Sequence, residues 1–275
     1  MNVLVRDIRL SYETAGSGPP YVLVHGGPGM GHPNRIGPYA QLADRVRVVA
    51  YEHRGHGASA RALVETYTIG DQAEDLHALI GALALERPIV AGTSAGGFAS
   101  LVYATRYPSE PRALVLIGTA PSGGFMARAT ANAERRGTPE IVAAYRRLWD
   151  GSLRDSVEFR RAFETIQPLY YHDPRRAPTS LAGRSFDPDT RHALIRDYAR
   201  YDVRPELSKI TVPTFIGVGR HDWICPVEES DEIRRLVPHA ELHVFERSGH
   251  SPQAEEPEAF FGRLRTFLDG VLPLA

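Results

Sequence analysis

Cysteine and lysine are almost absent from this chain of 275 residues, which contains one of each, Cys225 and Lys209. A single cysteine excludes an intramolecular disulfide and a metal site built from clustered cysteines. The 32 basic and 33 acidic residues nearly cancel, so the composition does not indicate a nucleic acid or an anionic membrane as a partner. There is no apolar run of about 18 residues and no basic segment leading into an apolar stretch at the start. We therefore expect a cytoplasmic protein without a membrane span.

Short apolar runs alternate with amphipathic segments along most of the chain. Several runs are continuously apolar, as in strands that are covered on both faces. One or two strands are predicted within residues 3–12, and single strands at 21–24, 46–51, 88–91, 113–118, 212–219 and 241–245. Helices are predicted at 69–85, 96–107, 227–236 and 257–268. This alternation predicts an α/β protein with a mostly parallel central sheet flanked by helices.

The alternation stops between residues 121 and 205, where no strand-like apolar run occurs. This stretch contains helical patterns such as 141–149 and 158–166 and is rich in arginine and aromatic residues. We predict that residues 1–120 and 206–275 form one core domain and that residues 121–205 are a helical cap inserted into it. A chain of this length is sufficient for one such domain with a sizeable core.

The most informative stretch is an apolar run, Ile89-Val90-Ala91, that ends at a serine between glycines, Gly92-Thr93-Ser94-Ala95-Gly96. As strand, turn and helix, it places Ser94 at the tip of a sharp elbow of the G-x-S-x-G type. Such an elbow holds the serine in a strained backbone conformation and needs small flanking residues where strand and helix pass each other. Gly92 and Gly96 provide that space. Ser94 is therefore the predicted nucleophile.

Two further polar loops follow predicted strands, at the edge where an open parallel sheet places its ligands. Asp222 lies after one of these strands, and His250 lies after the last one. A serine hydroxyl needs a base such as histidine, and a carboxylate fixes the tautomer of that histidine. Ser94, Asp222 and His250 have the chain order of the nucleophile-elbow hydrolases, and we predict that they form a catalytic triad. Asp197 and Asp202 are alternative acids.

An oxyanion hole is expected beside this serine, because positioned N–H donors stabilise the charge that develops on a substrate carbonyl. The N–H of the residue after the nucleophile, Ala95, is one predicted donor. The other is the N–H of Gly27, in the glycine-rich loop that follows the strand at 21–24.

The chain resembles the α/β-hydrolases over nearly its whole length. The motifs that carry the resemblance are HGGPG at 25–29, EHRGHGAS at 52–59, GTSAGG at 92–97, GRHDWICP at 219–226 and SGHSPQAEEPEAF at 248–260. The HGGPG loop and the Cys225-Pro226 pair are similar to those of the proline iminopeptidase branch, whose members remove N-terminal proline from peptides. The resemblance implies a serine hydrolase that cleaves an ester or amide bond of a small molecule or short peptide through an acyl-enzyme.

Two positions depart from the proline iminopeptidase pattern and keep other substrates open. Glu52-His53 stands where those enzymes usually have Asp-Gln, and Ala95 stands where they commonly have a bulky aromatic residue. They also need carboxylates near the cap for the substrate's ammonium group. Cap residues Glu134, Glu140, Glu158 and Glu164 are not aligned with those positions. A carboxylesterase or lactonase acting on a small acyl substrate is the alternative, and a non-catalytic ligand-binding member of the fold is a remote one.

The other polar residues are given a structural interpretation. We expect His25, His53 and Arg54 to hold loops through side-chain hydrogen bonds. His56 and His221 are expected to be exposed. The thiol of Cys225 is expected to be buried or partly buried and unreactive. No metal-ligand spacing such as His-Glu-x-x-His and no dinucleotide-binding motif occurs, so neither a metal nor a cofactor is predicted.

Aromatic side chains of the cap are expected to be mostly core, with a few that face Ser94 and shape an apolar pocket. The paired arginines at 135–136, 146–147 and 160–161 are expected on solvated faces. A site for a substrate carboxylate is the alternative for these pairs.

Overall fold

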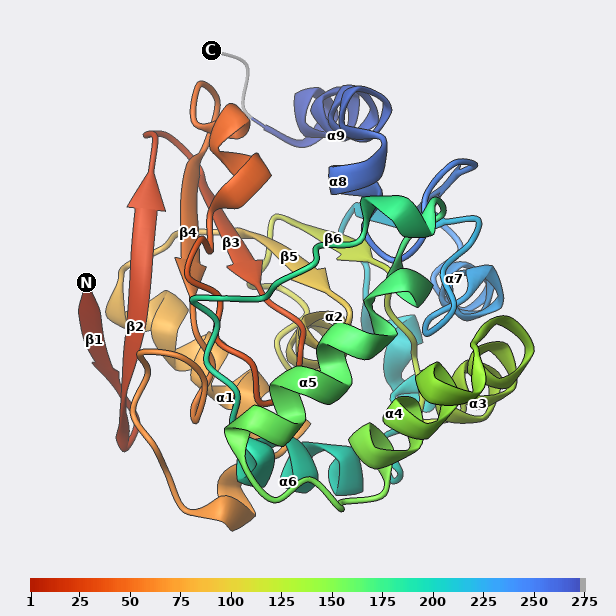
Figure 1. The fold of residues 1–275 in the computed structure, drawn as a ribbon. Helices are drawn as coiled ribbons and strands as arrows, with labels where there is room; N and C mark the ends of the chain where they lie inside the picture. The colour runs from red at the N-terminus through yellow and green to blue at the C-terminus, as the bar shows by residue number, and fades with distance from the viewer. Residues whose placement is uncertain (273–275) are drawn as a thin grey trace.

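The computed structural model describes residues 1–272 and is built on an eight-stranded sheet with helices on both faces (Figure 1). The strands are ordered β1 (Asn2–Val5), β2 (Ile8–Ala15), β4 (Arg47–Tyr51), β3 (Pro20–Val24), β5 (Ile89–Thr93), β6 (Ala113–Ile117), β7 (Thr214–Gly219) and β8 (Glu241–Phe245). The pairs β1–β2 and β2–β4 are antiparallel, and the other neighbours are parallel. The predicted α/β fold with a mostly parallel sheet is confirmed.

The side chains of the central strands alternate between two apolar layers, because successive residues of a strand point to opposite faces. Val90 and Leu114 belong to one layer, whereas Ile89 and Ala113 belong to the other. The first layer is covered by α1 (Ile69–Ala82), α2 (Ala95–Arg106) and α7 (Val227–Leu236), and the second by η1 (Gly37–Leu42) and α9 (Pro257–Val271). Burial on both faces is the reason that these strands have no polar alternation in the sequence.

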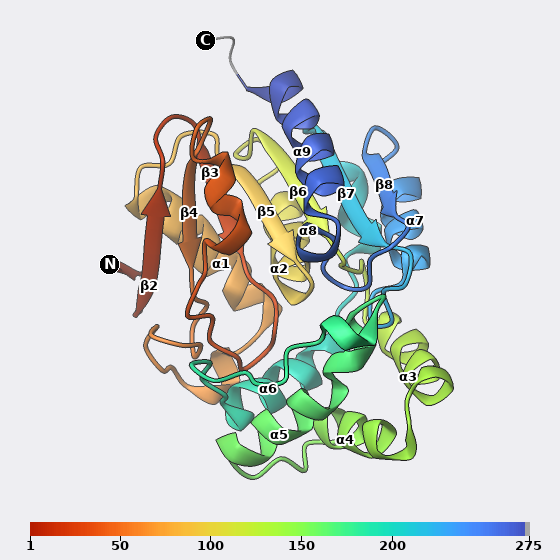
Figure 2. The same ribbon diagram turned by 45° about the horizontal axis from the view of Figure 1, so that its top comes forward.

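Between β6 and β7 the chain forms α3 (Phe125–Arg136), α4 (Pro139–Trp149), α5 (Ser156–Ile166) and α6 (Pro188–Tyr198). Figure 2 shows these helices gathered beyond the ends to which the parallel strands point. Side-chain oxygens of Thr138, Asp155 and Asp187 accept main-chain N–H bonds at the starts of α4, α5 and α6. The helical patterns at 141–149 and 158–166 correspond to α4 and α5, which both begin two residues earlier than predicted. The cap boundaries at 121 and 205 stay a prediction.

The glycine-rich loop after β3 is joined to the segment that leads into α6. The N–H of Asp187 donates to the carbonyl of Gly29 at 2.7 Å, and the N–H of Gly31 donates to the carbonyl of Ser185 at 2.9 Å. A Cβ atom on Gly29 would lie 2.9 Å from Cβ of Arg191, so the main chain of this loop touches α6 directly. The start of α6 is therefore fixed against the loop.

No helix within residues 1–272 has both the length and the apolar character needed to cross a lipid bilayer.

Candidate active site

Ser94 connects β5 to α2 and has backbone angles of φ 55° and ψ −126°. A non-glycine residue with positive φ costs on the order of 1–3 kcal/mol and persists only where its surroundings enforce it. The N–H of Ser94 donates to the carbonyl of Ile117 at 2.8 Å, and its own carbonyl accepts from Oγ1 of Thr119 at 2.8 Å. The end of strand β6 and the residues that follow it thus hold the serine in the strained conformation that the elbow motif predicts.

The glycines beside the serine have no room for a side chain. A Cβ atom on Gly96 would overlap the carbonyl of Val24 in β3, and one on Gly92 would overlap Oγ of Ser100 in α2. The helix therefore passes over the sheet at a distance that only glycine allows.

His250 and Asp222 are bonded to each other on the loops that follow β8 and β7. Nδ1 of His250 donates to Oδ2 of Asp222 at 2.7 Å, while Oδ1 of Asp222 accepts the N–H groups of Ile224 and Cys225, each at 3.0 Å. The carboxylate is buried. Because Asp222 accepts the proton on Nδ1, a neutral His250 has its lone pair on Nε2.

Ser94 and His250 line one cavity of about 370 Å³, together with the predicted oxyanion residues Gly27 and Ala95. Asp222 lies behind His250 and is not part of the lining. The alternative acids are engaged elsewhere, since Asp197 accepts the N–H of Ile69 at 2.7 Å and Asp202 forms an ion pair with Arg204 at 2.6 Å. The structure thus brings the predicted residues to one place.

The two predicted oxyanion donors lie on opposite sides of the serine in the sequence. Ala95 is the first residue of α2, where main-chain N–H groups have no acceptor within the helix. Gly27 has φ 76° in a turn closed by a 2.9 Å bond from the N–H of Met30 to its carbonyl. A Cβ atom on Gly26 would lie 2.7 Å from Cβ of Ser94, so the loop runs directly alongside the serine.

A cluster of three histidines supports this loop, of which His53 and His56 are buried and His25 is half-buried. Nδ1 of His25 donates to the carbonyl of Gly26 at 2.7 Å, and Nε2 of His25 accepts the N–H of His53 at 3.1 Å. Nε2 of His56 accepts the N–H of Gly29 at 2.9 Å. Each ring thus uses one nitrogen as an acceptor, which requires the neutral imidazole. The expectation that His56 is exposed is wrong, because its side chain is buried against the glycine-rich loop whose N–H it accepts. It is 2% exposed.

We predict that this cluster makes the protein acid-sensitive. Burial lowers the pKa of His25 and of His53, and it lowers the pKa of His56 from 6.5 to about 3. The unfolded chain therefore binds protons that the folded protein does not, so the contribution to stability is complete above pH 6.5 and falls as the pH drops. Well below pH 6.5, each such group lowers the free energy of unfolding by about 1.4 kcal/mol per pH unit.

Urea unfolding between pH 7.5 and 5.5 measures this loss. His56→Gln is expected to reduce the loss of unfolding free energy between pH 7.5 and 5.5 by about 1.4 kcal/mol in total, because this range is centred on the pKa of 6.5 of the unfolded chain. His239→Gln, which replaces an exposed histidine outside the cluster, should leave the slope unchanged. Equal slopes for His56→Gln and the wild type would contradict the prediction.

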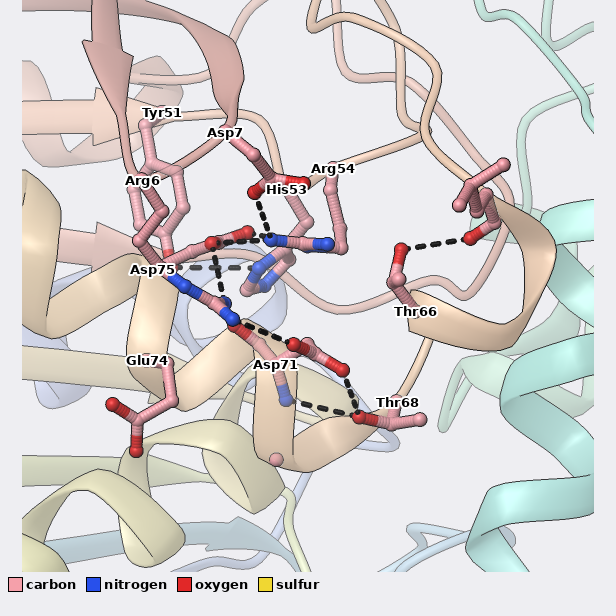
Figure 3. A network of polar contacts seen from close by, with 12 residues as sticks. Arg6, Asp7, Tyr51, His53, Arg54, Thr66, Thr68, Asp71, Glu74 and Asp75 are labelled. Carbon is pink, nitrogen blue, oxygen red and sulfur yellow. Dashed lines mark hydrogen bonds and ion pairs between the residues drawn. The ribbon is translucent and has the colours of Figure 1, made fainter.

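The loop that carries His53 and His56 is anchored by a buried ion pair. Figure 3 shows Arg54 beside Asp75 of α1, with Nε and Nη2 of Arg54 at 2.7 and 2.6 Å from the two carboxylate oxygens. Both side chains are at most 1% exposed, and Arg6 binds the same carboxylate at 3.0 Å. The structural interpretation of Arg54 agrees with these contacts.

Two contacts at this site have no place in the sequence-based prediction. Gly118, at the end of β6 with φ 51°, leaves room for the acid and base, because a Cβ there would lie 3.0 Å from Oδ2 of Asp222. A glycine at the carboxyl end of a strand is a signal that could have found it. Tyr170 accepts the main-chain N–H of His250 at 2.8 Å and packs its ring edge-on against that imidazole. Tyr170 is one of the cap aromatics expected in the core or the pocket, but no sequence pattern indicated its bond to His250.

Aromatic side chains form much of the rest of the cavity wall, as predicted for a few members of the cap: Phe125, Trp149, Phe163, Tyr170, Tyr171 and Tyr198. Cys225 also lines the cavity and is buried, as expected, and burial raises the pKa of its thiol. His221 is half-buried rather than exposed. Within residues 1–272, no group of His, Cys, Asp and Glu side chains is arranged to hold a metal ion.

The chain is similar in sequence and structure to named proteins over nearly its full length. A family model described as alpha/beta hydrolase fold matches residues 19–257. The chain is 30% identical to the proline iminopeptidase PfmaB of Pestalotiopsis fici, over 97% of this chain and 98% of that protein. It is also 30% identical to a 2-hydroxy-6-oxo-2,4-heptadienoate hydrolase of Pseudomonas putida, over 97% and 95% of the two chains. An alpha/beta fold family hydrolase from Bacillus anthracis matches with a TM-score of 0.80 and 25% identity, over 99% and 98%.

Proposed function

The chain belongs to the alpha/beta hydrolase fold family, in the branch that includes proline iminopeptidases, and we propose that it is a serine hydrolase with Ser94, His250 and Asp222 as its triad. The observation that carries the proposal is the 2.7 Å bond between His250 and the buried carboxylate of Asp222, beside a cavity that Ser94 and His250 share. This arrangement leaves Nε2 of His250 free to act as a base.

The proposed reaction proceeds through an acyl-enzyme. Nε2 of His250 takes the proton of the Ser94 hydroxyl as Oγ attacks the substrate carbonyl, and the oxyanion is held by the N–H groups of Gly27 and Ala95. His250 then gives this proton to the departing alcohol or amine. A water molecule that His250 deprotonates attacks the acyl-enzyme, and the acid leaves as Ser94 regains its proton.

The cavity lining favours an ester or lactone of a small acyl compound. No aspartate or glutamate lines the cavity within residues 1–272, whereas three arginines do, Arg35, Arg184 and Arg191. An aminopeptidase needs an acceptor for the substrate's ammonium group. The cap carboxylates considered for that role are absent from the lining: Glu134 pairs with Arg146, Glu158 pairs with Arg147 and Arg154, Glu164 accepts the N–H of Leu181, and Glu140 is exposed.

A proline iminopeptidase is the second candidate, and the 30% identity to an enzyme of that name favours it. The substrate is proposed to be a small molecule or a short peptide in either case. Neither a nucleic acid nor a membrane is proposed as a partner. We propose that the protein is located in the cytoplasm.

Matched substrate pairs separate the two candidates. We expect turnover of p-nitrophenyl butyrate or of a small lactone, and equally slow cleavage of proline p-nitroanilide and N-acetylproline p-nitroanilide, which differ only in the free ammonium group. Preference of about 100-fold for the free amine would instead assign an aminopeptidase, because such a preference requires a site for the ammonium group. The Ser94→Ala variant serves as the blank for every substrate.

A further inference from the structure

Arg191 is a buried arginine in the wall of the active-site cavity. Its residue is 4% exposed, and its Nε donates to the carbonyl of Leu148 at 2.8 Å. Within residues 1–272, Nη1 and Nη2 of Arg191 have neither a hydrogen-bond acceptor nor a carboxylate in ion-pair contact. A largely buried guanidinium without a counter-charge is unfavourable, so its unpaired edge in the cavity wall requires an explanation.

Arg54 shows how this protein satisfies an arginine whose role is structural. That side chain is also buried, and its Nε and Nη2 both donate to the carboxylate of Asp75. No acid replaces Asp75 beside Arg191 among the described residues. The open edge of Arg191 is therefore not a general consequence of burying arginine in this fold.

The contacts that Arg191 does make hold it in one orientation. The bond to Leu148 satisfies a carbonyl in the last turn of α4, and the guanidinium carbon lies 5.6 Å from the ring centre of Trp149 and 5.0 Å from that of Phe159. These contacts use one N–H group and the faces of the guanidinium plane. The remaining edge is a preorganised fork of N–H donors, the arrangement that binds a carboxylate with two parallel hydrogen bonds.

A neutral donor accompanies this fork. Tyr198, on the same helix α6, also lines the cavity, and its buried hydroxyl has no hydrogen-bond partner within residues 1–272. Burial raises the pKa of the Tyr198 hydroxyl, which keeps it protonated as a donor. Burial also lowers the pKa of Arg191 to about 10, so the guanidinium is charged at neutral pH.

We propose that the cavity takes an acyl substrate with a second, free carboxylate, which Arg191 and Tyr198 bind while Ser94 attacks the ester bond. This assignment rests on the proposed serine hydrolase function and names its substrate class, an anionic ester. Hydrolysis consumes one water and yields the second acid and an alcohol. The sequence offered the paired arginines 135–136, 146–147 and 160–161 as an alternative binding site for a substrate carboxylate, but none of them lines the cavity. We assign that role to Arg191, which the sequence did not indicate.

Pairs of anionic and neutral esters test the proposal. On the acyl side, p-nitrophenyl hemiesters of succinate, glutarate and adipate are compared with p-nitrophenyl butyrate, valerate and hexanoate. On the leaving-group side, 4-carboxyphenyl butyrate is compared with phenyl butyrate. We expect kcat/KM to favour the anionic member about 100-fold in one of these arms, and the best chain length reports the distance between serine and arginine.

Arg191→Gln should remove this preference, so that the ratio of kcat/KM for the anionic ester to that for its matched neutral ester falls from about 100 to near one. Arg191→Lys, which keeps the charge but loses the fork, should restore only part of it. Arg196→Gln, at an exposed position of the same helix, is the control and should keep the full preference. Thermal melting of each variant reports whether it is folded.

Direct binding separates failure of the inference from failure of the proposed function. Turnover of neutral esters without any preference for the anionic pairs would overturn the carboxylate site and leave the serine hydrolase intact. Calorimetric binding of glutarate that Arg191→Gln abolishes, with no ester turned over, would support the site and refute the proposed function. If Arg191→Gln does not fold, the preference of the wild-type enzyme decides alone, and equal rates within every pair would overturn the proposal.

Discussion

Replacing Ser94 by alanine is expected to lower kcat for p-nitrophenyl butyrate by about 10⁶-fold, because no acyl-enzyme can form without the Oγ nucleophile. The residual rate would come from the oxyanion donors and substrate positioning, which the substitution leaves in place. The fold should persist, since the φ of 55° is enforced by bonds from the main chain of Ser94 to Ile117 and Thr119.

Steady-state kinetics and covalent labelling test this prediction together. A fluorophosphonate should add to wild-type protein at Ser94, as mass spectrometry of the digested chain would report, and should not add to Ser94→Ala. Ser152→Ala, at an exposed position, is the matched control. Retention of more than about 1% of wild-type turnover by Ser94→Ala would refute the nucleophile, since losses at the nucleophile of a triad are far larger. Absence of turnover in the wild type would favour the ligand-binding alternative.

Asp222→Asn is expected to lower kcat by about 10⁴-fold while the protein stays folded. The N–H groups of Ile224 and Cys225 both donate to Oδ1, so the amide oxygen of asparagine is held at that position. The amide nitrogen then occupies the place of Oδ2 and donates to Nδ1 of His250. This bond moves the imidazole proton to Nε2, where it blocks acceptance of the serine proton.

Stopped assays over a long time course can measure such a loss if Ser94→Ala supplies the background. Asp202→Asn, which removes a carboxylate that pairs with Arg204 and does not line the cavity, should keep activity within about threefold of the wild type. A folded Asp222→Asn variant with more than about a tenth of wild-type kcat would remove Asp222 from the mechanism, because loss of the correct tautomer is far more costly.

The strands and the elbow were predictable because their determinants are local. Helix α7 (Val227–Leu236) and strand β8 (Glu241–Phe245) have the predicted bounds, and Ser94 occupies the predicted turn. Asp222 and His250 could be paired in advance, since parallel strands bring their carboxyl ends to one edge of the sheet.

The helices between β6 and β7 were less predictable, because their positions depend on contacts far away in the chain. Helices α3 and α6 have no individual prediction, and the loop between α5 and α6 gave no pattern at all. The error on His56 has a related cause. Its burial follows from the bond to the N–H of Gly29 in another loop, and no local pattern encodes that bond.

By itself, the sequence determined the α/β architecture and the candidate residues Ser94, Asp222 and His250, because apolar periodicity and glycine spacing act over a few neighbouring positions. Only the tertiary structure decided what surrounds them. Main-chain bonds between the glycine-rich loop and the start of α6 place Arg191 in the cavity wall without an acidic partner. From sequence alone, an arginine in an amphipathic helix is predicted to be solvated. Only the packing of that helix determines whether the guanidinium is buried and which of its nitrogens lack acceptors.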